Sequence, residues 1–211
     1  SIDESVRPFI EATERIGRIA STLAPAPIAA VDVEVLGEAA ELDVRVLQLS
    51  ALKGVFSVLV EDPVSYVNAP VLAADRGVET SLSTEGESPE HRTIVRVKLA
   101  LTDGRTVAVA GTVTGPRDLE KLIEIDGFEI DVPISEHMAF YTYEDKPGIV
   151  GVVGQILGSA DVNIAGMQVS RTKAGGEALI ALTVDSAIPQ PALDEIANKI
   201  GAAAVHAVDL D

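Results

Sequence analysis

The chain lacks cysteine and tryptophan entirely, and aromatic residues make up only 3% of its 211 residues. The absence of cysteine excludes disulfide bonds, thiolate nucleophiles and cysteine metal sites, and favours a reducing compartment. Because bulky aromatic side chains are rare, we expect a core built from Val, Ile, Leu and Ala. Such small-residue packing suits helices that lie on sheets.

Basic residues are also scarce. Sixteen Lys and Arg stand against 33 Asp and Glu, which gives a formal net charge of -17. This charge repels phosphate backbones and anionic lipid surfaces, so we expect neither a nucleic-acid nor a membrane partner. No apolar run reaches the roughly 20 residues of a membrane span, and the first residues lack a signal-peptide pattern. We therefore expect a soluble, cytoplasmic protein.

The first part of the chain mixes helices and strands. Helical spacing of apolar residues continues to about residue 24, and residues 28–37 then alternate between valine and acidic residues, as in a half-buried strand. Residues 47–60 and 67–77 follow as helices. Later β-branched runs are separated by Asp103-Gly104 and by Asp126-Gly127, which are hairpin signals. The sequence predicts an α+β domain with an antiparallel sheet.

A domain boundary is predicted where the strand pattern, a proline and a polar pair meet, at Pro133, Ser135 and Glu136. The first domain then covers residues 1–135 and the second covers residues 136–211. The most turn-like stretch before this boundary is TEGESPEH, which we interpret as a solvated loop.

The second domain has the order β-α-β-β-α-β. The predicted elements are a strand at 137–144, a helix at 147–160, a strand at 162–172, a turn at 173–176, a strand at 177–185, a helix at 189–201 and a strand at 202–210. This order is typical of ferredoxin-like folds, in which both helices lie on one face of a four-stranded antiparallel sheet. The edges of such a sheet are commonly paired with a second copy.

The helix at 147–160 has one apolar face and one face of glycines. The glycines are Gly148, Gly151, Gly154 and Gly158. A helix side without side chains lets another helix, a neighbouring domain or a bound molecule approach its backbone closely. The spacing is not GxGxxG, so it does not indicate a dinucleotide site.

The start of this helix offers a polar pocket. Pro147 is preset for the first helical turn, and the amide groups that follow suit a carboxylate. Asp145 ends the preceding strand and Asn163 begins the next, and we expect these two ends to meet on one edge of the layer. An acid, an amide and a helix N-terminus together fit an amino acid. The alternative is that Asp145 only caps the helix and Asn163 only shapes a turn.

The stretch YEDKPGIVGVVGQILGSADVNIAGMQVSR resembles an ACT domain, a regulatory module that binds small molecules, and the resemblance covers residues from about 137 to 211. The preceding segments LQLSALKGVFSVLVEDPVSYVNAPVLAADRGV, TEGESPEHRTIVRVKLALTDG and VAGTVTGPR are similar to another domain. That domain is the intervening, allosteric-substrate-binding domain of the long bacterial D-3-phosphoglycerate dehydrogenases.

This resemblance implies a regulatory role. In that family the turns that flank the first ACT helix bind L-serine at a dimer interface, as the feedback inhibitor of serine synthesis. The match implies that Tyr143, Asp145 and Asn163 contact the effector and that Pro147, Gly148 and Ile164 shape its site. It also implies a homodimer or homotetramer. The alternatives are a module that senses another amino acid, or an ACT domain that only dimerises.

The resemblance also implies what lies outside these residues. The parent enzyme of that family is an NAD-dependent oxidoreductase, and its nucleotide-binding and catalytic domains precede this region. No part of the 211 residues resembles those domains, so we expect neither catalysis, cofactor nor metal on this chain. Its histidines, His91, His137 and His206, lie in separate elements and are not assigned to catalysis.

The resemblance also implies that the intervening domain binds anions or phosphorylated substrate. The candidate residues here are Lys53, His91, Arg92, Arg117 and Lys121. A phosphate site needs converging donors, and the stretch GFEIDVP is acidic and apolar where relatives carry more basic residues. The alternative is that these five residues are ordinary surface charges.

Overall fold

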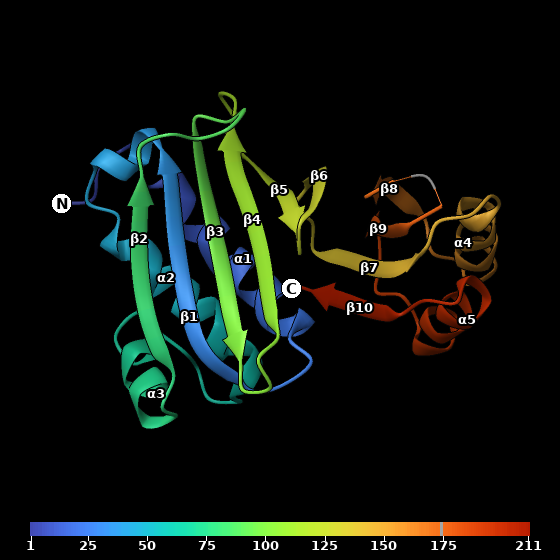
Figure 1. Ribbon diagram of the computed structural model, residues 1–211, viewed down its shortest axis with the longest axis horizontal. Coiled ribbons are helices and arrows are strands. Elements are labelled where there is room, and N and C mark those ends of the chain that lie inside the picture. The colour runs from blue at the N-terminus through green and yellow to red at the C-terminus, as the bar shows by residue number, and fades with distance from the viewer. Residues whose placement is uncertain (174) are drawn as a thin grey trace. The chain divides into compact units, whose positions relative to one another are not determined.

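The structure is a computed structural model that describes residues 1–173 and 175–211. It divides into two compact units, Ser1–Gly127 and Phe128–Asp211 (Figure 1). Each unit combines helices with a mainly antiparallel sheet, which confirms the predicted α+β class. The predicted boundary at residues 135 and 136 lies further along the chain and stays a prediction.

The first unit begins with a helix and contains five strands. Its elements are α1 (Pro8–Leu23), β1 (Ile28–Gly37), the 3-10 helix η1 (Glu38–Glu41), α2 (Arg45–Leu59), α3 (Ala69–Asp75), β2 (Glu79–Glu85), β3 (Thr93–Leu101), β4 (Thr106–Thr114) and β5 (Leu119–Ile125). The strands run in the order β2-β1-β3-β4-β5. The pairs from β1 to β5 are antiparallel, as predicted, whereas β2 pairs with β1 in parallel. The parallel pair arises because α2 and α3 carry the chain back before β2 begins.

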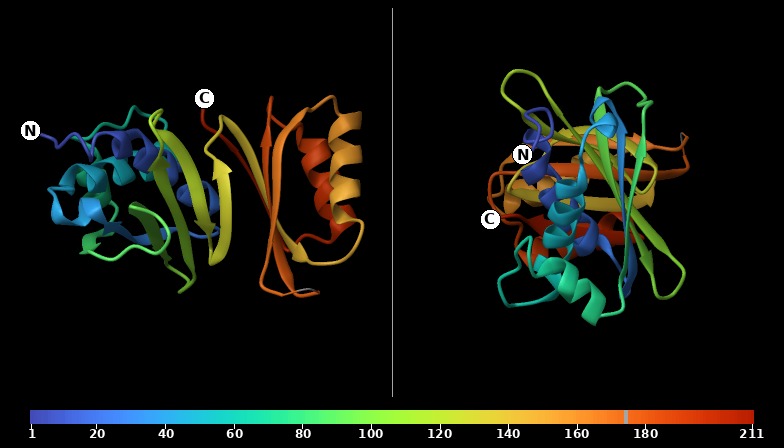
Figure 2. Two further views of the ribbon diagram at one scale, coloured as in Figure 1. Left: turned by 90° about the horizontal axis from the view of Figure 1, so that it is seen from above. Right: turned by 90° about the vertical axis from the view of Figure 1, so that its left-hand side faces the viewer.

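The alternation in β1 separates the two faces of this sheet. Val31, Val33 and Val35 are all at most 1% exposed, while Asp32 and Glu34 between them are half-buried. Helices α1 and α2 lie on one face of the sheet (Figure 2). The predicted hairpin at Asp103-Gly104 joins β3 to β4, and Gly104 has the positive φ of +88° that such a loop requires.

The second unit has the predicted β-α-β-β-α-β order, preceded by one further strand. Its elements are β6 (Phe128–Pro133), β7 (His137–Glu144), α4 (Ile149–Ser159), β8 (Ile164–Arg171), β9 (Glu177–Val184), α5 (Gln190–Ile200) and β10 (Ala204–Asp209). The antiparallel sheet has the order β10-β7-β9-β8, with α4 and α5 on one face (Figure 2). The ferredoxin-like arrangement is therefore confirmed. The predicted turn at 173–176 includes residue 174, which lies outside the described residues.

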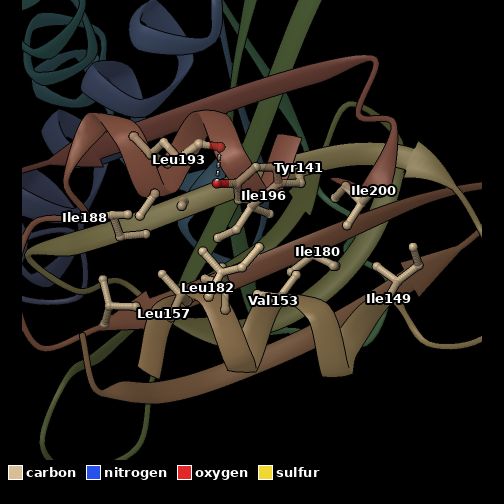
Figure 3. Close-up of a cluster of buried hydrophobic side chains, with 14 of the residues drawn as sticks. Tyr141, Ile149, Val153, Leu157, Ile180, Leu182, Ile188, Leu193, Ile196 and Ile200 are labelled. Atoms are coloured by element: carbon tan, nitrogen blue, oxygen red, sulfur yellow. Dashed lines mark hydrogen bonds between the residues drawn. The ribbon is translucent and has the colours of Figure 1, made fainter. Parts of the chain in front are cut away.

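The core of the second unit lies between this sheet and its two helices. Ile149, Val153 and Leu157 of α4 face Ile196 and Ile200 of α5 across the buried cluster (Figure 3). The hydroxyl of Tyr141 donates a hydrogen bond of 3.2 Å to the carbonyl oxygen of Leu193, which satisfies a buried polar group. The predicted apolar face of α4 is thus the face that packs on the sheet.

Two glycines set the contact between α1 and α2 in the first unit. A Cβ atom added to Gly17 would lie 2.5 Å from the carbonyl oxygen of Ala51, and one added to Gly54 would lie 1.9 Å from that of Glu14. Both distances are far shorter than van der Waals contact. The two helix backbones therefore approach so closely that only glycine fits at these positions.

We predict that Gly54→Ala destabilises the first unit by about 1–3 kcal/mol, because the added methyl group must push the two helices apart. Urea unfolding measures the change. Gly86→Ala is a matched control, since its Cβ would meet only the flexible end of Glu41, at 3.3 Å. The control should change stability by less than about 0.5 kcal/mol. Equal effects of the two substitutions would contradict the close-contact explanation.

Candidate functional site

Asp145 follows β7 and is engaged by the segment that joins β8 to β9. Its Oδ2 accepts hydrogen bonds from Nη1 of Arg171 at 3.1 Å and from the backbone N–H of Gly175 at 3.3 Å. Its own backbone N–H donates to the carbonyl oxygen of Gly176 at 2.8 Å. The side chain of Asp145 is only 16% exposed, against 56% for Arg171. Asp145, the predicted effector-binding residue, is therefore already paired with a cation, Arg171.

The start of α4 differs from the sequence prediction. The helix begins at Ile149, so Pro147 lies before the N-cap rather than in the first turn. Gly148 is the N-cap residue and has φ of +90°, a conformation that glycine adopts without strain. Within the described chain, no side chain caps this helix, so Asp145 is not its cap. The first amide groups of α4 carry partial positive charge at a surface position.

Tyr143 lies in the core beneath this charged pair. It is 2% exposed and belongs to the buried cluster that includes Ile149 and Val153. Burial raises the pKa of its hydroxyl, the negative charge of Asp145 raises this pKa further, and Arg171 opposes the shift. Both charges of the ion pair thus act on the hydroxyl of Tyr143.

Asn163 lies directly before β8, at the other end of α4. Its Nδ2 donates a hydrogen bond of 2.7 Å to Oδ2 of Asp185, and its carbonyl oxygen accepts one from the backbone of Asp185 at 3.0 Å. Ile164, the first residue of β8, is half-buried. These contacts hold the amide at the junction of β8 with the end of β9.

The expected meeting of Asp145 with Asn163 within one chain is wrong. Tyr143 and Arg171 both pair with Ala178 of β9, whereas Ile164 pairs with Val184 at the opposite end of that strand. Strands β7 and β8 run in the same direction, and α4 returns the chain along the whole sheet before β8 begins. The two ends are separated by the length of β8, about 23 Å at 3.3 Å per residue.

The glycine face of α4 is open in this chain. A Cβ atom added to Gly151, Gly154 or Gly158 would meet none of the described atoms within 4 Å. Val150 lies beside this face and is 49% exposed. The glycines therefore do not serve packing within the described chain, in contrast to Gly17 and Gly54.

Arg171 is a charged residue of this region that the sequence did not predict. It ends β8 in the stretch QVSR, with no motif to mark it. A signal was present in the topology, because β7 and β8 are parallel strands on either side of β9 and their carboxyl ends lie at the same end of the sheet. A cation at the end of β8 is therefore within reach of an acid at the end of β7.

Each unit of the chain matches the model of a known domain family. Residues 5–126 match the model of the D-3-phosphoglycerate dehydrogenase intervening domain, and residues 137–201 match the ACT domain model. The first match covers more than half of the chain. The chain belongs to the D-3-phosphoglycerate dehydrogenase intervening-domain family, and it carries an ACT domain as well.

Similarity over nearly the whole of this chain leads to the same family of dehydrogenases. The chain is 37% identical over 209 residues to the D-3-phosphoglycerate dehydrogenase of Mycobacterium leprae, a match that covers 99% of this chain and 40% of that protein. It is 31% identical over 208 residues to that of a Synechocystis species, with 98% and 37% covered. For Bacillus subtilis the identity is 30% over 205 residues, with 97% and 39% covered. The chain thus spans about 40% of the length of these relatives and matches their C-terminal region.

The basic residues predicted for an anion site in the intervening domain are dispersed. Lys53 lies on α2, 3.5 Å from Glu14, with its ammonium group 4.7 Å from the centre of the Tyr66 ring. His91 and Arg92 lie just before β3, Arg117 lies in the turn before β5, and Lys121 lies on β5. Arg92 lines a cleft of about 510 Å³, whose other charged lining residues are Glu4, Glu38 and Asp118. A cleft lined by three carboxylates and one guanidinium does not favour a phosphate group, and the anion site stays a prediction.

The described residues lack two further features, a metal-ligating cluster and a membrane-spanning helix. No group of three or more His, Cys, Asp or Glu side chains among them is arranged to hold a metal ion. None of the helices they form combines the length and apolar character that crossing a membrane requires.

His137 forms an ion pair at the start of the ACT sheet. Its Nδ1 lies 2.7 Å from Oδ1 of Asp209, and its Nε2 lies 3.9 Å from Oδ2 of Asp211. The hydrogen bond to Asp209 raises the pKa of His137 above its usual 6.5, and the charges of Asp209, Asp211 and Glu136 add to the shift. The pair joins β7 to the last strand, β10, where His137 and Asp209 are register partners.

We predict that Asp209→Asn returns the pKa of His137 towards 6.5, with a smaller decrease for Asp211→Asn because its contact is longer. Because the folded-state pKa is raised, the pair stabilises the fold below about pH 6.5, and this contribution is lost as pH rises through the folded-state pKa. NMR titration of the His137 ring measures the shift. An unchanged pKa in the Asp209→Asn variant would show that the hydrogen bond does not cause it.

Proposed function

We propose that this chain is the regulatory region of a D-3-phosphoglycerate dehydrogenase and that it binds L-serine between the ACT domains of two copies. Serine then acts as a feedback inhibitor of its own synthesis. The supporting comparison is the family membership of both units, which correspond to the C-terminal region of longer dehydrogenases.

The observation that carries the proposal is the position of Asp145 and Asn163 at opposite ends of α4. One small effector cannot contact both residues in one chain. A two-fold axis beside α4 reverses the direction of the helix in the second copy, so that Asp145 of one copy lies near Asn163 of the other. Two equivalent sites then form at each interface.

The open side of α4 supports this arrangement. Its glycines let a second copy approach the helix backbone, since no described side chain of this chain covers them. Strand β8 is also an outer strand of the ACT sheet, and Val169 on it is 38% exposed. Outer strands of this kind are commonly paired with another copy.

Each polar group has a chemical role in the proposed site. The carboxylate of Asp145 binds the ammonium group of serine, and the uncapped N-terminus of α4 binds the carboxylate. Asn163 of the second copy supplies an amide for the hydroxyl group. Pro147, Gly148 and Ile164 shape the surrounding surface. The contact of Tyr143 with the effector stays a prediction, because this side chain is 2% exposed in the single chain.

The remainder of the proposal concerns the longer protein. Its activity is the NAD-dependent oxidation of 3-phosphoglycerate in the cytoplasm, and NAD binds to domains outside these 211 residues. Serine influences that activity by favouring one arrangement of the paired ACT domains over another, because a ligand shifts an equilibrium only through its different affinities for the two states. The intervening domain relays the change.

Calorimetric titration with L-serine tests the proposal. We expect binding to the wild-type chain, about tenfold or more weaker binding to Asp145→Ala because a charge-assisted hydrogen bond is lost, and a smaller loss for Asn163→Ala. Sedimentation should show that serine shifts the chain towards a dimer, since a ligand that bridges two copies favours the assembled state.

Glu195→Ala is the matched control, because it removes an equal charge from an exposed position of α5. This variant should bind serine like the wild type. If millimolar L-serine gives neither heat nor protection from thermal unfolding, the proposed function is wrong. A panel of other amino acids in the same titration identifies a different effector.

A further inference from the structure

The ion pair between Arg171 and Asp145 has no role in the proposed recognition of serine. In the free chain, the guanidinium donates to the same carboxylate that the proposed function assigns to the ammonium group of the effector. Two donors, Nη1 of Arg171 and the backbone N–H of Gly175, converge on Oδ2 of Asp145. The cation of the effector therefore approaches an acid that already has a cationic partner.

Two cations at one carboxylate oppose each other. If the ammonium group replaces Arg171, the ion pair and its hydrogen bond are lost. If it binds at the second oxygen while Arg171 stays, two positive charges lie within a few ångströms and repel. Either course weakens effector binding, so the sign of the effect does not depend on which one occurs.

The exposure of Arg171 agrees with a partner that can leave. Its side chain is 56% exposed, while that of Asp145 is 16% exposed. Exposed ion pairs contribute little to stability, so the guanidinium can turn into solvent at small cost. Tyr143, near the end of β7, belongs to the buried hydrophobic cluster.

We infer that Arg171 is an internal competitor for the effector's ammonium group and thereby sets the affinity of the site. The inference rests on the proposed function, because it concerns the same carboxylate. It makes a specific statement about the ligand: Arg171 opposes only molecules that bring a positive charge to Asp145.

Arg171→Gln tests the inference, because it removes the charge and keeps most of the length of the side chain. Calorimetry compares L-serine with 3-hydroxypropanoate, which is serine without its ammonium group. The variant should bind L-serine about two- to fivefold more tightly, as expected for the loss of a competing exposed ion pair. Its affinity for 3-hydroxypropanoate should not increase.

Two further variants control for other causes. Lys173→Gln removes an equal charge two residues away without touching the hydrogen bond to Asp145, and Arg171→Lys keeps the charge. Both should bind L-serine within about twofold of the wild type, since Lys173→Gln leaves the ion pair of Arg171 with Asp145 in place and Arg171→Lys keeps the positive charge beside Asp145. Thermal unfolding of each variant checks that the fold is retained.

The outcomes separate the two proposals. If the wild type binds L-serine and Arg171→Gln binds it equally or more weakly, Arg171 is not a competitor and the inference is overturned, while the proposed function stands. An equal loss of affinity for serine and 3-hydroxypropanoate would also overturn the inference, and would make Arg171 a partner of the ligand's own carboxylate. If neither the wild type nor Arg171→Gln binds L-serine, both proposals are wrong.

Discussion

The length of α4 is the constraint on which the proposed site depends. The helix packs Ile149, Val153 and Leu157 against the ACT sheet. It must return the chain along the length of the strands before β8 can begin. Asp145 and Asn163 consequently lie at opposite ends of the same layer. The fold that positions these polar residues also prevents them from forming a site within one chain. A second copy is the simplest way to bring them together.

Glycine has two different uses in this chain. Gly17 and Gly54 permit close contact between α1 and α2, because the partner backbone occupies the space of a side chain. Gly151 and Gly154 on α4 have no such neighbour among the described atoms. A helix that carries glycines at an open surface loses helical stability, about 0.5–1 kcal/mol for each glycine relative to alanine. Packing of another molecule on this open surface would offset the loss of helical stability.

Local patterns predicted most of the fold. The alternation in residues 28–37 and the order of elements from His137 onward depend on neighbouring residues, and the corresponding strands and helices appear where the sequence places them. The parallel pairing of β2 with β1 and the ion pair of Arg171 with Asp145 were not predicted. Both depend on strand register between distant segments, which no local pattern contains. Pro147 favours a helix start in general, but Gly148 adopts a left-handed conformation and delays the helix by two residues.

The most direct test of the shared site combines two defective variants. When Asp145→Ala and Asn163→Ala chains are co-expressed with different tags, a mixed dimer holds one site with both native side chains and one with neither. Calorimetry of the co-expressed preparation should then show L-serine binding restored in about a quarter of all sites, as random pairing in a two-fold dimer requires. A preparation that binds no more L-serine than the two variants do separately would contradict a site built from two copies.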